Sequence, residues 1–248
     1  MPPLALTFAA SDPTGGAGVQ ADLLTLAALG CHPLSVLTGV TVQDTTGVEL
    51  FEALRADLVE RQARRVLAES KVAAIKVGVL GSADNVRAVA AIAAEHAHVP
   101  LVLDPVLASG RGDVLASDSV LESLLEFLVP RATILTPNTL EAKLLGGEKR
   151  LLALGCRYVL VTGTHDAGAE VVNRLYDARG LVREDRWERL PGSYHGSGCT
   201  LASAIAAALA KGADVAAAVR GAQEFTWRAL AAGFRTGAGQ SLPNRFFG

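Results

Sequence analysis

The amino-acid sequence predicts an α/β fold in which a mostly parallel central sheet carries helices on both faces. The main observation is that short apolar runs suited to strands alternate with stretches of helical apolar spacing, at roughly even intervals. The chain has 248 residues, half of them hydrophobic, which is ample for a large core. No internal repeat, low-complexity segment or convincing linker divides it, so we expect residues 1–248 to form a single domain.

The first apolar run, Leu4–Ala9, is suited to a buried strand and leads through a glycine-rich loop into the helix Val19–Leu29. A strand, a glycine loop and a helix are the first half of a βαβ unit. Gly16–Ala21 also fits the GxGxxA pattern of dinucleotide sites. That match is weak, because Ser11–Thr14 separate the strand from the glycines, whereas a dinucleotide fold places its first glycine directly after the strand.

The middle of the chain continues the alternation of strands and helices. Strands are expected at Pro33–Val42, Ala73–Val77, Leu101–Leu103 and Ala132–Leu135, and helices at Asp57–Leu67, Ala83–His96 and Asp118–Val129, with a further helix starting within Thr136–Glu141. Ser82 is expected to cap Ala83–His96, and the arginines of Asp57–Leu67 are expected to face outward. Residues 109–113 are predicted to form a flexible loop.

The C-terminal part of the chain is predicted to add a strand, a hairpin and a helix pair. The strand is Tyr158–Thr162, the hairpin joins Glu170–Tyr176 to Leu181–Arg189, the helices are Leu201–Ala210 and Ala213–Ala232, and the tail Phe234–Gly248 is expected to be irregular.

Composition excludes several classes of partner. The formal charge is −2 and no basic run occurs, so neither nucleic acid nor a membrane is an expected partner. Three scattered cysteines are too few for a disulfide framework or a zinc cluster and favour a reducing compartment. No signal peptide is recognisable at the N-terminus, and the Ala-rich stretch Leu201–Ala210 is too short to span a membrane. We therefore expect a soluble cytoplasmic protein.

A second glycine loop, Tyr194–Thr200, leads into a long apolar helix. Gly196 and Gly198 lack side chains, so successive backbone N–H groups can converge on one anion. The unpaired amides and dipole of a helix start favour a phosphate or a developing negative charge there. Cys199 would feel the same field, which predicts a lowered thiol pKa. The alternative interpretation is a tight loop into a buried helix, with Cys199 as a small apolar filler.

Other residues with chemical potential follow the predicted strands. The carboxyl ends of parallel strands meet at one edge of a sheet, where ligands bind. The residues expected there are Asp12, Gln43, Asp104, Asn138, Glu141, Thr162 and the loop Gly196–Cys199. Glycine loops, carboxylates and an anion-ready helix start in one crevice indicate phosphoryl transfer with Mg²⁺. For two of these residues a purely structural role is the alternative. Glu141 could be an acidic residue in the first turn of a helix, and Asp104 could form a turn before Pro105. His195 is interpreted as a loop residue.

These residues resemble the phosphomethylpyrimidine kinase family of thiamine biosynthesis, and the resemblance runs over nearly the whole chain. Ser11–Asp22 resembles the family's N-terminal block, Val42–Thr45 its pyrimidine-recognition segment, and His195–Thr200 its anion-hole motif. Asn138–Glu141 has the NxxE form with which the wider superfamily organises water-bound Mg²⁺. The resemblance implies a ribokinase-like three-layer sandwich.

The resemblance also implies roles for particular residues. Cys199 stands where sugar-kinase relatives carry a catalytic Asp, and with Gly196, Ser197 and Gly198 it would form the catalytic group. The substrate-binding residues would be Gln43, whose amide pairs with the ring, and Asp12, Gly15, Ala17, Ala10 and Val79. The nucleotide-binding residues would be Asp104, Asn138, Glu141, Thr162 and Gly163, of which Glu141 would hold Mg²⁺ through water and Asp104 is a further candidate metal ligand.

Several positions depart from the family pattern. Thr162-Gly163-Thr164-His165 stands where typical members have a Lys-Gly-Gly-His run, so the lysine is lost. The segment Lys143–Leu154 is shorter than usual by about a dozen residues. Ala10 replaces a usual glycine and Val79 a usual methionine, both beside the expected pyrimidine pocket. These departures concern catalytic efficiency and substrate more than fold or reaction class.

We therefore expect an ATP-dependent kinase that phosphorylates 4-amino-5-hydroxymethyl-2-methylpyrimidine and then its monophosphate. A pyridoxal kinase is the first alternative, favoured by Thr162 and the altered pocket. A catalytically weak pyrimidine-binding regulatory protein is the second, motivated by the lost lysine. The family suggests a homodimer.

Overall fold

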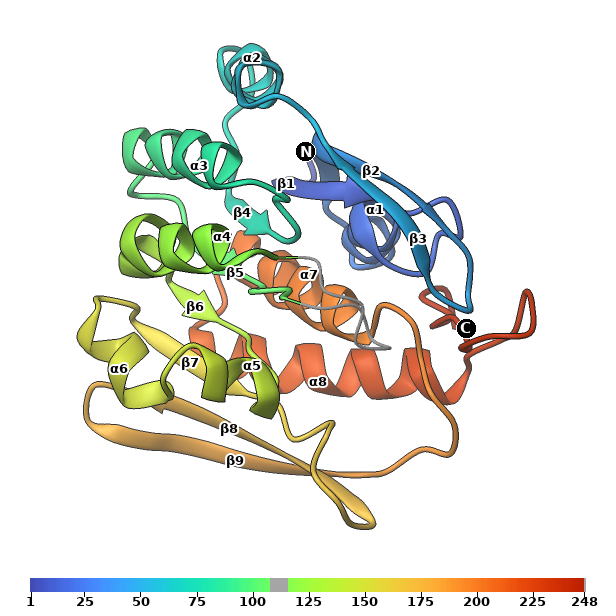
Figure 1. Cartoon of the computed structure of the whole chain (residues 1–248). Coiled ribbons are helices and arrows are strands. Elements are labelled where there is room, and N and C mark those ends of the chain that lie inside the picture. Colours follow the sequence, from blue (N-terminus) through green and yellow to red (C-terminus); the bar gives the residue numbers. More distant parts are fainter. Residues whose placement is uncertain (108–115, 248) are drawn as a thin grey trace.

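A nine-stranded sheet with the strand order β3-β2-β1-β4-β5-β6-β7-β8-β9 forms the centre of the computed structural model, which describes residues 1–107 and 116–247 (Figure 1). Strands β2, β1, β4, β5, β6 and β7 run parallel, whereas β3, β8 and β9 are joined by antiparallel pairs. The predicted mostly parallel sheet is therefore confirmed. The predicted loop 109–113 lies outside the described residues.

The strands are β1 (Leu4–Ser11), β2 (His32–Gln43), β3 (Val48–Ala53), β4 (Ala74–Val77), β5 (Leu101–Leu103), β6 (Ile134–Leu135), β7 (Tyr158–Val161), β8 (Glu170–Asp177) and β9 (Gly180–Glu188). The helices are α1 (Gly18–Ala28), α2 (Ala56–Leu67), α3 (Ala83–Glu95), α4 (Asp118–Ser123), α5 (Thr139–Leu144), α6 (Glu148–Ala153), α7 (Ser197–Ala210) and α8 (Val215–Ala231).

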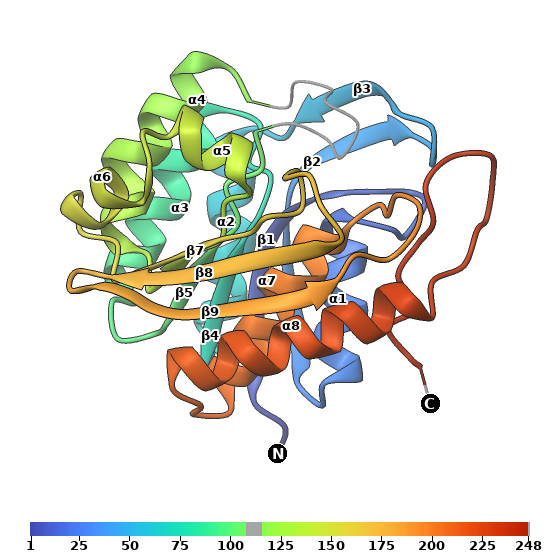
Figure 2. The same cartoon turned by 90° about the horizontal axis from the view of Figure 1, so that it is seen from below.

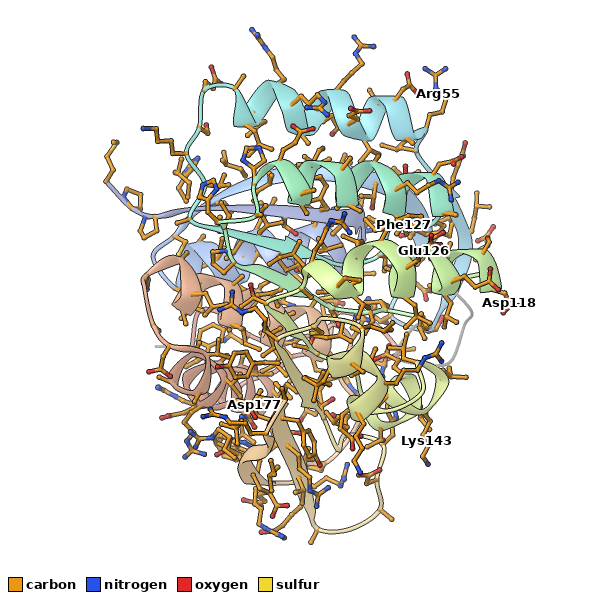
Figure 3. All side chains as sticks on the ribbon, turned by 90° about the vertical axis from the view of Figure 1, so that its left-hand side faces the viewer. Arg55, Asp118, Glu126, Phe127, Lys143 and Asp177 are labelled. Atoms are coloured by element: carbon orange, nitrogen blue, oxygen red, sulfur yellow. The ribbon has the colours of Figure 1, made fainter. Side chains whose placement is uncertain are left out.

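Helices cover both faces of the sheet (Figures 1 and 2). On one face α2, α3 and α4 lie side by side, with Arg55 at the start of α2 and Asp118 at the start of α4 (Figure 3). Their apolar side chains pack on Leu6 and Phe8 of β1. On the other face α1, α7 and α8 pack on residues such as Ala5 of the same strand. Alternate residues of one strand thus reach opposite cores, because side chains alternate along a strand.

The sequence did not predict β3 or α6. Strand β3 is the edge strand beside β2 in the described sheet, and its side chains are largely exposed, so it lacks a continuous apolar run. Helix α6 follows Gly146 and Gly147, which both have positive φ, at 92° and 88°. The predicted helix Asp118–Val129 is broken into α4, a π-helical turn at Leu124–Leu128 and a 3₁₀ turn at Val129–Arg131. Pro130 lacks an N–H and cannot continue an α-helical ladder.

Several local predictions are confirmed. The Ser82 side chain caps α3 by accepting a hydrogen bond from the Asn85 N–H. The arginines of α2 are exposed, and the β8–β9 hairpin pairs in antiparallel register. Helix α7 begins at Ser197 rather than Leu201, which brings the glycine loop into its first turn. Within the described residues, no helix combines the length and the apolar character that crossing a bilayer requires.

Candidate active site

The sequence-predicted residues lie where the parallel strands end. Asp12 follows β1, Gln43 ends β2, Asp104 follows β5 and Thr162 follows β7. Since these strands are parallel, their carboxyl ends share one edge of the sheet, and Gly198 at the start of α7 lies near Asp104 at that edge. The structure therefore brings the predicted residues to one side of the molecule.

The Asp12 carboxylate shapes the first glycine loop. It accepts hydrogen bonds from the Thr14 N–H at 2.8 Å and the Ala17 N–H at 2.6 Å. Its second oxygen also lies 2.8 Å from Nε2 of His195, in the second glycine loop. Burial of Asp12 raises its pKa, but hydrogen bonds from His195, Gln43 and Ala17 outweigh that effect and hold the pKa below its usual range. The carboxylate is thus committed to protein contacts, and its contact with substrate stays a prediction.

The second glycine loop turns into α7 at Gly196, whose φ is 82°. Ser197, Gly198 and Cys199 form the first turn, so their N–H groups have no acceptor within the helix. The Gly196 backbone lies against the Gly16 carbonyl, which joins the two glycine loops. A Cβ atom added to Gly198 would lie 3.9 Å from both Asp104 oxygens, so a carboxylate flanks this helix start. The predicted loop and helix start are confirmed.

Cys199 differs from the expectation. Its side chain is half-buried, and burial raises the pKa of the thiol to about 12, although the Lys76 charge acts to lower it. The carboxylates of Asp104 and Asp22 raise it further. The sequence-based expectation of a lowered thiol pKa is therefore wrong, because burial and two neighbouring carboxylates outweigh the lysine and the helix start.

A buried ion pair lies below this helix start. The Lys76 ammonium in β4 donates to Oδ2 of Asp22 in α1 at 2.9 Å, and the two side chains are 1% and 0% exposed. Asp22 also accepts hydrogen bonds from Thr7 and from Ser203 of α7. Burial acts to lower the pKa of Lys76, but the Asp22, Cys199 and Asp104 charges raise it above its usual range.

Sequence reasoning gave this pair no role, although a lysine within the otherwise apolar strand β4 was a usable signal. A Cβ atom added to Gly78 would lie 2.6 Å from the Lys76 Nζ, so a larger residue there would displace the ammonium group.

Asp104 and Glu141 are buried carboxylates that repel each other. Burial raises the pKa of Asp104 to about 6, although Lys76 acts to lower it. Burial and the Asp104 charge raise the pKa of Glu141 to about 8. Oδ2 of Asp104 is buried without a hydrogen-bond partner among the described residues. An unpaired carboxylate oxygen near a second buried carboxylate fits Mg²⁺, a cation that prefers oxygen ligands.

Asn138 and Glu141 also begin α5 with a reciprocal capping box. The Asn138 side chain accepts from the Glu141 N–H at 3.0 Å, and Glu141 Oε2 accepts from the Asn138 N–H at 2.9 Å. The other Glu141 oxygen faces the Leu107 N–H at 3.4 Å. The structural interpretation of Glu141 as a first-turn acid is thus confirmed, and its burial beside Asp104 adds a second property.

The remaining predicted nucleotide residues lie beside α5. Thr162 forms an isolated bridge with Asn138, and its carbonyl accepts from the Thr139 N–H at 3.1 Å. The Gly163 N–H donates a hydrogen bond to Oδ1 of Asn173 at 3.1 Å. An amide held in this way has no proton left for a phosphate, so nucleotide binding by Gly163 stays a prediction.

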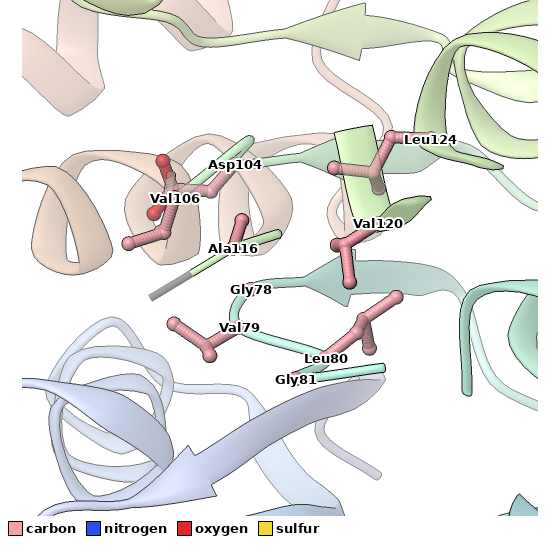
Figure 4. A pocket seen from close by; sticks show the side chains of 9 residues that line it. All are labelled: Gly78, Val79, Leu80, Gly81, Asp104, Val106, Ala116, Val120 and Leu124. Carbon is pink, nitrogen blue, oxygen red and sulfur yellow. The ribbon is translucent and has the colours of Figure 1, made fainter. Parts of the chain in front are cut away.

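Figure 4 shows a small cavity lined by Val79 and Asp104 together with Gly78, Leu80, Gly81, Val106, Ala116, Val120 and Leu124. A residue predicted for the substrate and one predicted for the nucleotide therefore share a wall. Gly15 has open space where a Cβ atom would lie, whereas Ala10 is buried. Substrate contacts of Ala10, Gly15, Ala17, Gln43 and Val79 stay predictions.

The chain is similar to known proteins both in sequence and in fold. The family model described as phosphomethylpyrimidine kinase matches residues 12–244. A hydroxymethylpyrimidine/phosphomethylpyrimidine kinase of Streptomyces coelicolor is 44% identical, over 96% of this chain and 92% of that protein. Among solved structures, an ADP complex of Bacillus subtilis pyridoxal kinase has a TM-score of 0.86 at 29% identity, covering 99% of this chain and 98% of the other. A phosphomethylpyrimidine kinase of Clostridium difficile has a TM-score of 0.78 at 33% identity, covering 90% and 97%.

Proposed function

The chain belongs to the phosphomethylpyrimidine kinase family, and we propose that it transfers phosphoryl groups from ATP in thiamine biosynthesis. The first acceptor is the hydroxymethyl group of 4-amino-5-hydroxymethyl-2-methylpyrimidine, and the second is the resulting monophosphate. The observation that carries the proposal is the α7 start, where Ser197, Gly198 and Cys199 supply first-turn amides and Gly198 lies beside the Asp104 carboxylate.

The first-turn amides of α7 are the proposed stabilisers of the transferring phosphoryl group. Phosphoryl transfer proceeds through a loose transition state, so catalysis is mainly positioning and charge stabilisation. Fixed backbone N–H groups at a helix start supply both without reorganising during the reaction. The Gly16 and Gly196 contact holds the substrate loop against this helix start, which favours approach of the hydroxyl to the γ-phosphate.

Cys199 is the proposed acceptor of the hydroxyl proton, through the minor thiolate form. With a thiol pKa of about 12, ionised sulfur is scarce near neutral pH, and the Lys76 charge acts in its favour. The proposed catalysis therefore combines charge stabilisation by the amides with proton removal by the thiolate, and the second contribution increases with pH.

Mg²⁺ fits the pair Asp104 and Glu141, because an unpaired buried oxygen and two carboxylates with raised pKa values favour a divalent cation. We propose that Glu141 holds the metal through water and that Asp104 contributes an oxygen. The bound metal would neutralise phosphate charge. Glu141 keeps its place through the capping box with Asn138, so the same contact sets the helix start and the carboxylate.

The proposal is tested by steady-state turnover of ATP with the hydroxymethylpyrimidine, its monophosphate, pyridoxal and pyridoxine. We expect kcat/KM for the two pyrimidines to exceed that for the two pyridines. A preference for pyridoxal would instead select the pyridoxal kinase alternative, which the comparisons do not favour. Pyrimidine binding without turnover would select a regulatory protein.

Three further properties belong to the proposal. One sheet runs through the described chain, which supports a single kinase domain over residues 1–248. The exposed apolar side chains Val40, Val42 and Leu50 on the paired strands β2 and β3 support a homodimer, which light scattering would test. All three cysteines are free, which supports a cytoplasmic location.

A further inference from the structure

The C-terminal tail contributes a buried arginine to the region between the two glycine loops. Arg245 is 4% exposed and donates three hydrogen bonds. Its Nη1 and Nη2 donate to the carbonyl oxygens of Gly15 at 3.3 Å and Gly16 at 2.5 Å, in the first loop. Its Nε donates to Oγ1 of Thr200, in the first turn after the second loop, at 3.1 Å. One planar guanidinium therefore connects both loops.

Thr200 connects Arg245 to the start of α7. Its hydroxyl donates to the Gly196 carbonyl at 2.8 Å while it accepts from Arg245. Gly196 in turn lies against Gly16, which is itself an Arg245 partner. The arginine, the threonine and the two glycines form a closed set of contacts. Displacing the guanidinium would loosen the two loops, which would then depend on the Gly16–Gly196 contact and the His195–Asp12 hydrogen bond.

The rest of the tail adds contacts in the same region. The His195 N–H donates to the Ser241 carbonyl at 2.9 Å. The Gln240 N–H donates to the Thr45 carbonyl, also at 2.9 Å, so the tail reaches the turn after Gln43. In Figure 1 the tail, in red, lies beside the turn that connects β2 to β3. The tail therefore contacts both glycine loops and the turn after Gln43.

The charge of Arg245 needs an explanation that packing does not supply. No carboxylate forms an ion pair with it among residues 1–107 and 116–247, although a buried cation is ordinarily paired. Burial lowers its pKa, while the nearby Cys199, Asp22 and Asp12 act in the opposite direction. A positive charge next to the first turn of α7 would attract an anion bound there.

We propose that Arg245 is a positioning residue that holds the substrate loop and the phosphate-binding helix start in one fixed arrangement. The inference rests on the proposed kinase function. Each loop keeps its own ligand contacts when the guanidinium is removed, but the acceptor hydroxyl and the phosphoryl group lose their alignment. The effect therefore falls on kcat more than on either KM, because a displacement of about 1 Å is enough to cost on the order of 10²-fold in rate.

The test compares Arg245→Met, which removes the guanidinium, with Arg245→Lys, which keeps the charge but lacks the planar fork. Phe246→Ala is the matched control, because its side chain is next in the tail and 61% exposed. We expect Arg245→Met to lower kcat by roughly 10- to 100-fold with each KM within about threefold of wild type. Arg245→Lys should recover only part of kcat, and Phe246→Ala should match wild type.

Hydrogen exchange measured by mass spectrometry supplies a readout independent of turnover. In Arg245→Met, peptides covering 12–18 and 196–202 should exchange faster, while the β8–β9 hairpin should be unchanged. Unchanged kcat, full recovery by lysine, or faster exchange throughout the molecule would overturn the positioning role. An inactive wild-type protein would instead overturn the proposed function, and hydrogen exchange would still decide whether Arg245 couples the loops.

Discussion

A methyl group on Gly196 would lie 1.8 Å from the carbonyl oxygen of Gly16, so the two glycine loops meet through their main chains at this point. The loops are far apart in the sequence, yet their backbones are in direct contact, so each restricts the conformation of the other. His195 strengthens the junction by contacting the Asp12 carboxylate at 2.8 Å. The proposed chemistry depends on this contact, because it places the substrate loop against the start of α7.

Gly196→Ala should therefore separate the loops and lower turnover by on the order of 10²-fold. Gly212→Ala is the matched control, because Gly212 has a similar φ, 85° against 82°, but nothing near its added Cβ atom. The control substitution should cost only the roughly 1 kcal/mol of a left-handed non-glycine residue and leave kcat unchanged. Turnover and urea unfolding of both variants measure the difference. Equal effects of the two substitutions would show that backbone strain, rather than the loop contact, matters.

Glu141→Gln should raise the Mg²⁺ concentration needed for half-maximal activity by roughly 10- to 100-fold. Glutamine at this position can still accept the Asn138 N–H, so the capping box and the start of α5 are expected to persist. The change therefore removes charge without removing the helix start. The measurement is a magnesium titration of turnover at saturating substrates, with the melting temperature as the check on folding. An unaltered magnesium requirement would leave Glu141 with its capping role alone.

The Cys199 thiol is predicted to react slowly with iodoacetamide at neutral pH, because its pKa is raised to about 12. While the pH stays below the pKa, the thiolate fraction increases tenfold for each unit by which the pH rises. Wild-type turnover should therefore increase with pH between about 7 and 9. Cys199→Ala should lose on the order of 10²–10⁴-fold in turnover and lose this pH dependence, with ATP affinity retained. A near-normal rate in the alanine variant would remove the proton-acceptor role.

Gln43→Leu should weaken pyrimidine binding by roughly 1–3 kcal/mol, because a primary amide matches the adjacent amino group and ring nitrogen of an aminopyrimidine. Calorimetry with the hydroxymethylpyrimidine measures the loss, and the affinity for an ATP analogue serves as the internal control. Gln43 also hydrogen-bonds to Asp12, so a shared loss of both affinities would indicate a disturbed loop. Unchanged pyrimidine affinity would exclude Gln43 from the substrate site.

Asp22→Asn should lower the free energy of unfolding by roughly 3–5 kcal/mol, because it leaves the Lys76 ammonium buried without its counter-charge. Asp57→Asn is the control, since it breaks an exposed ion pair with Arg55 and should change stability little. Urea unfolding followed by circular dichroism measures both. A small effect of Asp22→Asn would mean that water or a structural rearrangement compensates for the lost counter-charge of Lys76.

The sequence predicted the sheet and the loops at its edge because buried parallel strands have continuous apolar runs and glycine loops follow them. Strand β3 was missed because an edge strand has no such run. The raised pKa of Cys199 comes first from burial and then from Asp104 and Asp22, and both effects arise only in the folded chain. Arg245 lies in a segment predicted to be irregular, and its partners Gly15 and Gly16 lie 230 and 229 residues away. No local pattern contains that contact.

The central proposal is stepwise phosphorylation of one pyrimidine alcohol at the edge of the sheet. The direct test is mass spectrometry of a reaction that contains the protein, ATP, Mg²⁺ and 4-amino-5-hydroxymethyl-2-methylpyrimidine, sampled over time. We expect the monophosphate to form first and to convert to the diphosphate, with one ADP released at each step. Persistence of the unmodified alcohol, while pyridoxal is phosphorylated under the same conditions, would contradict the proposal.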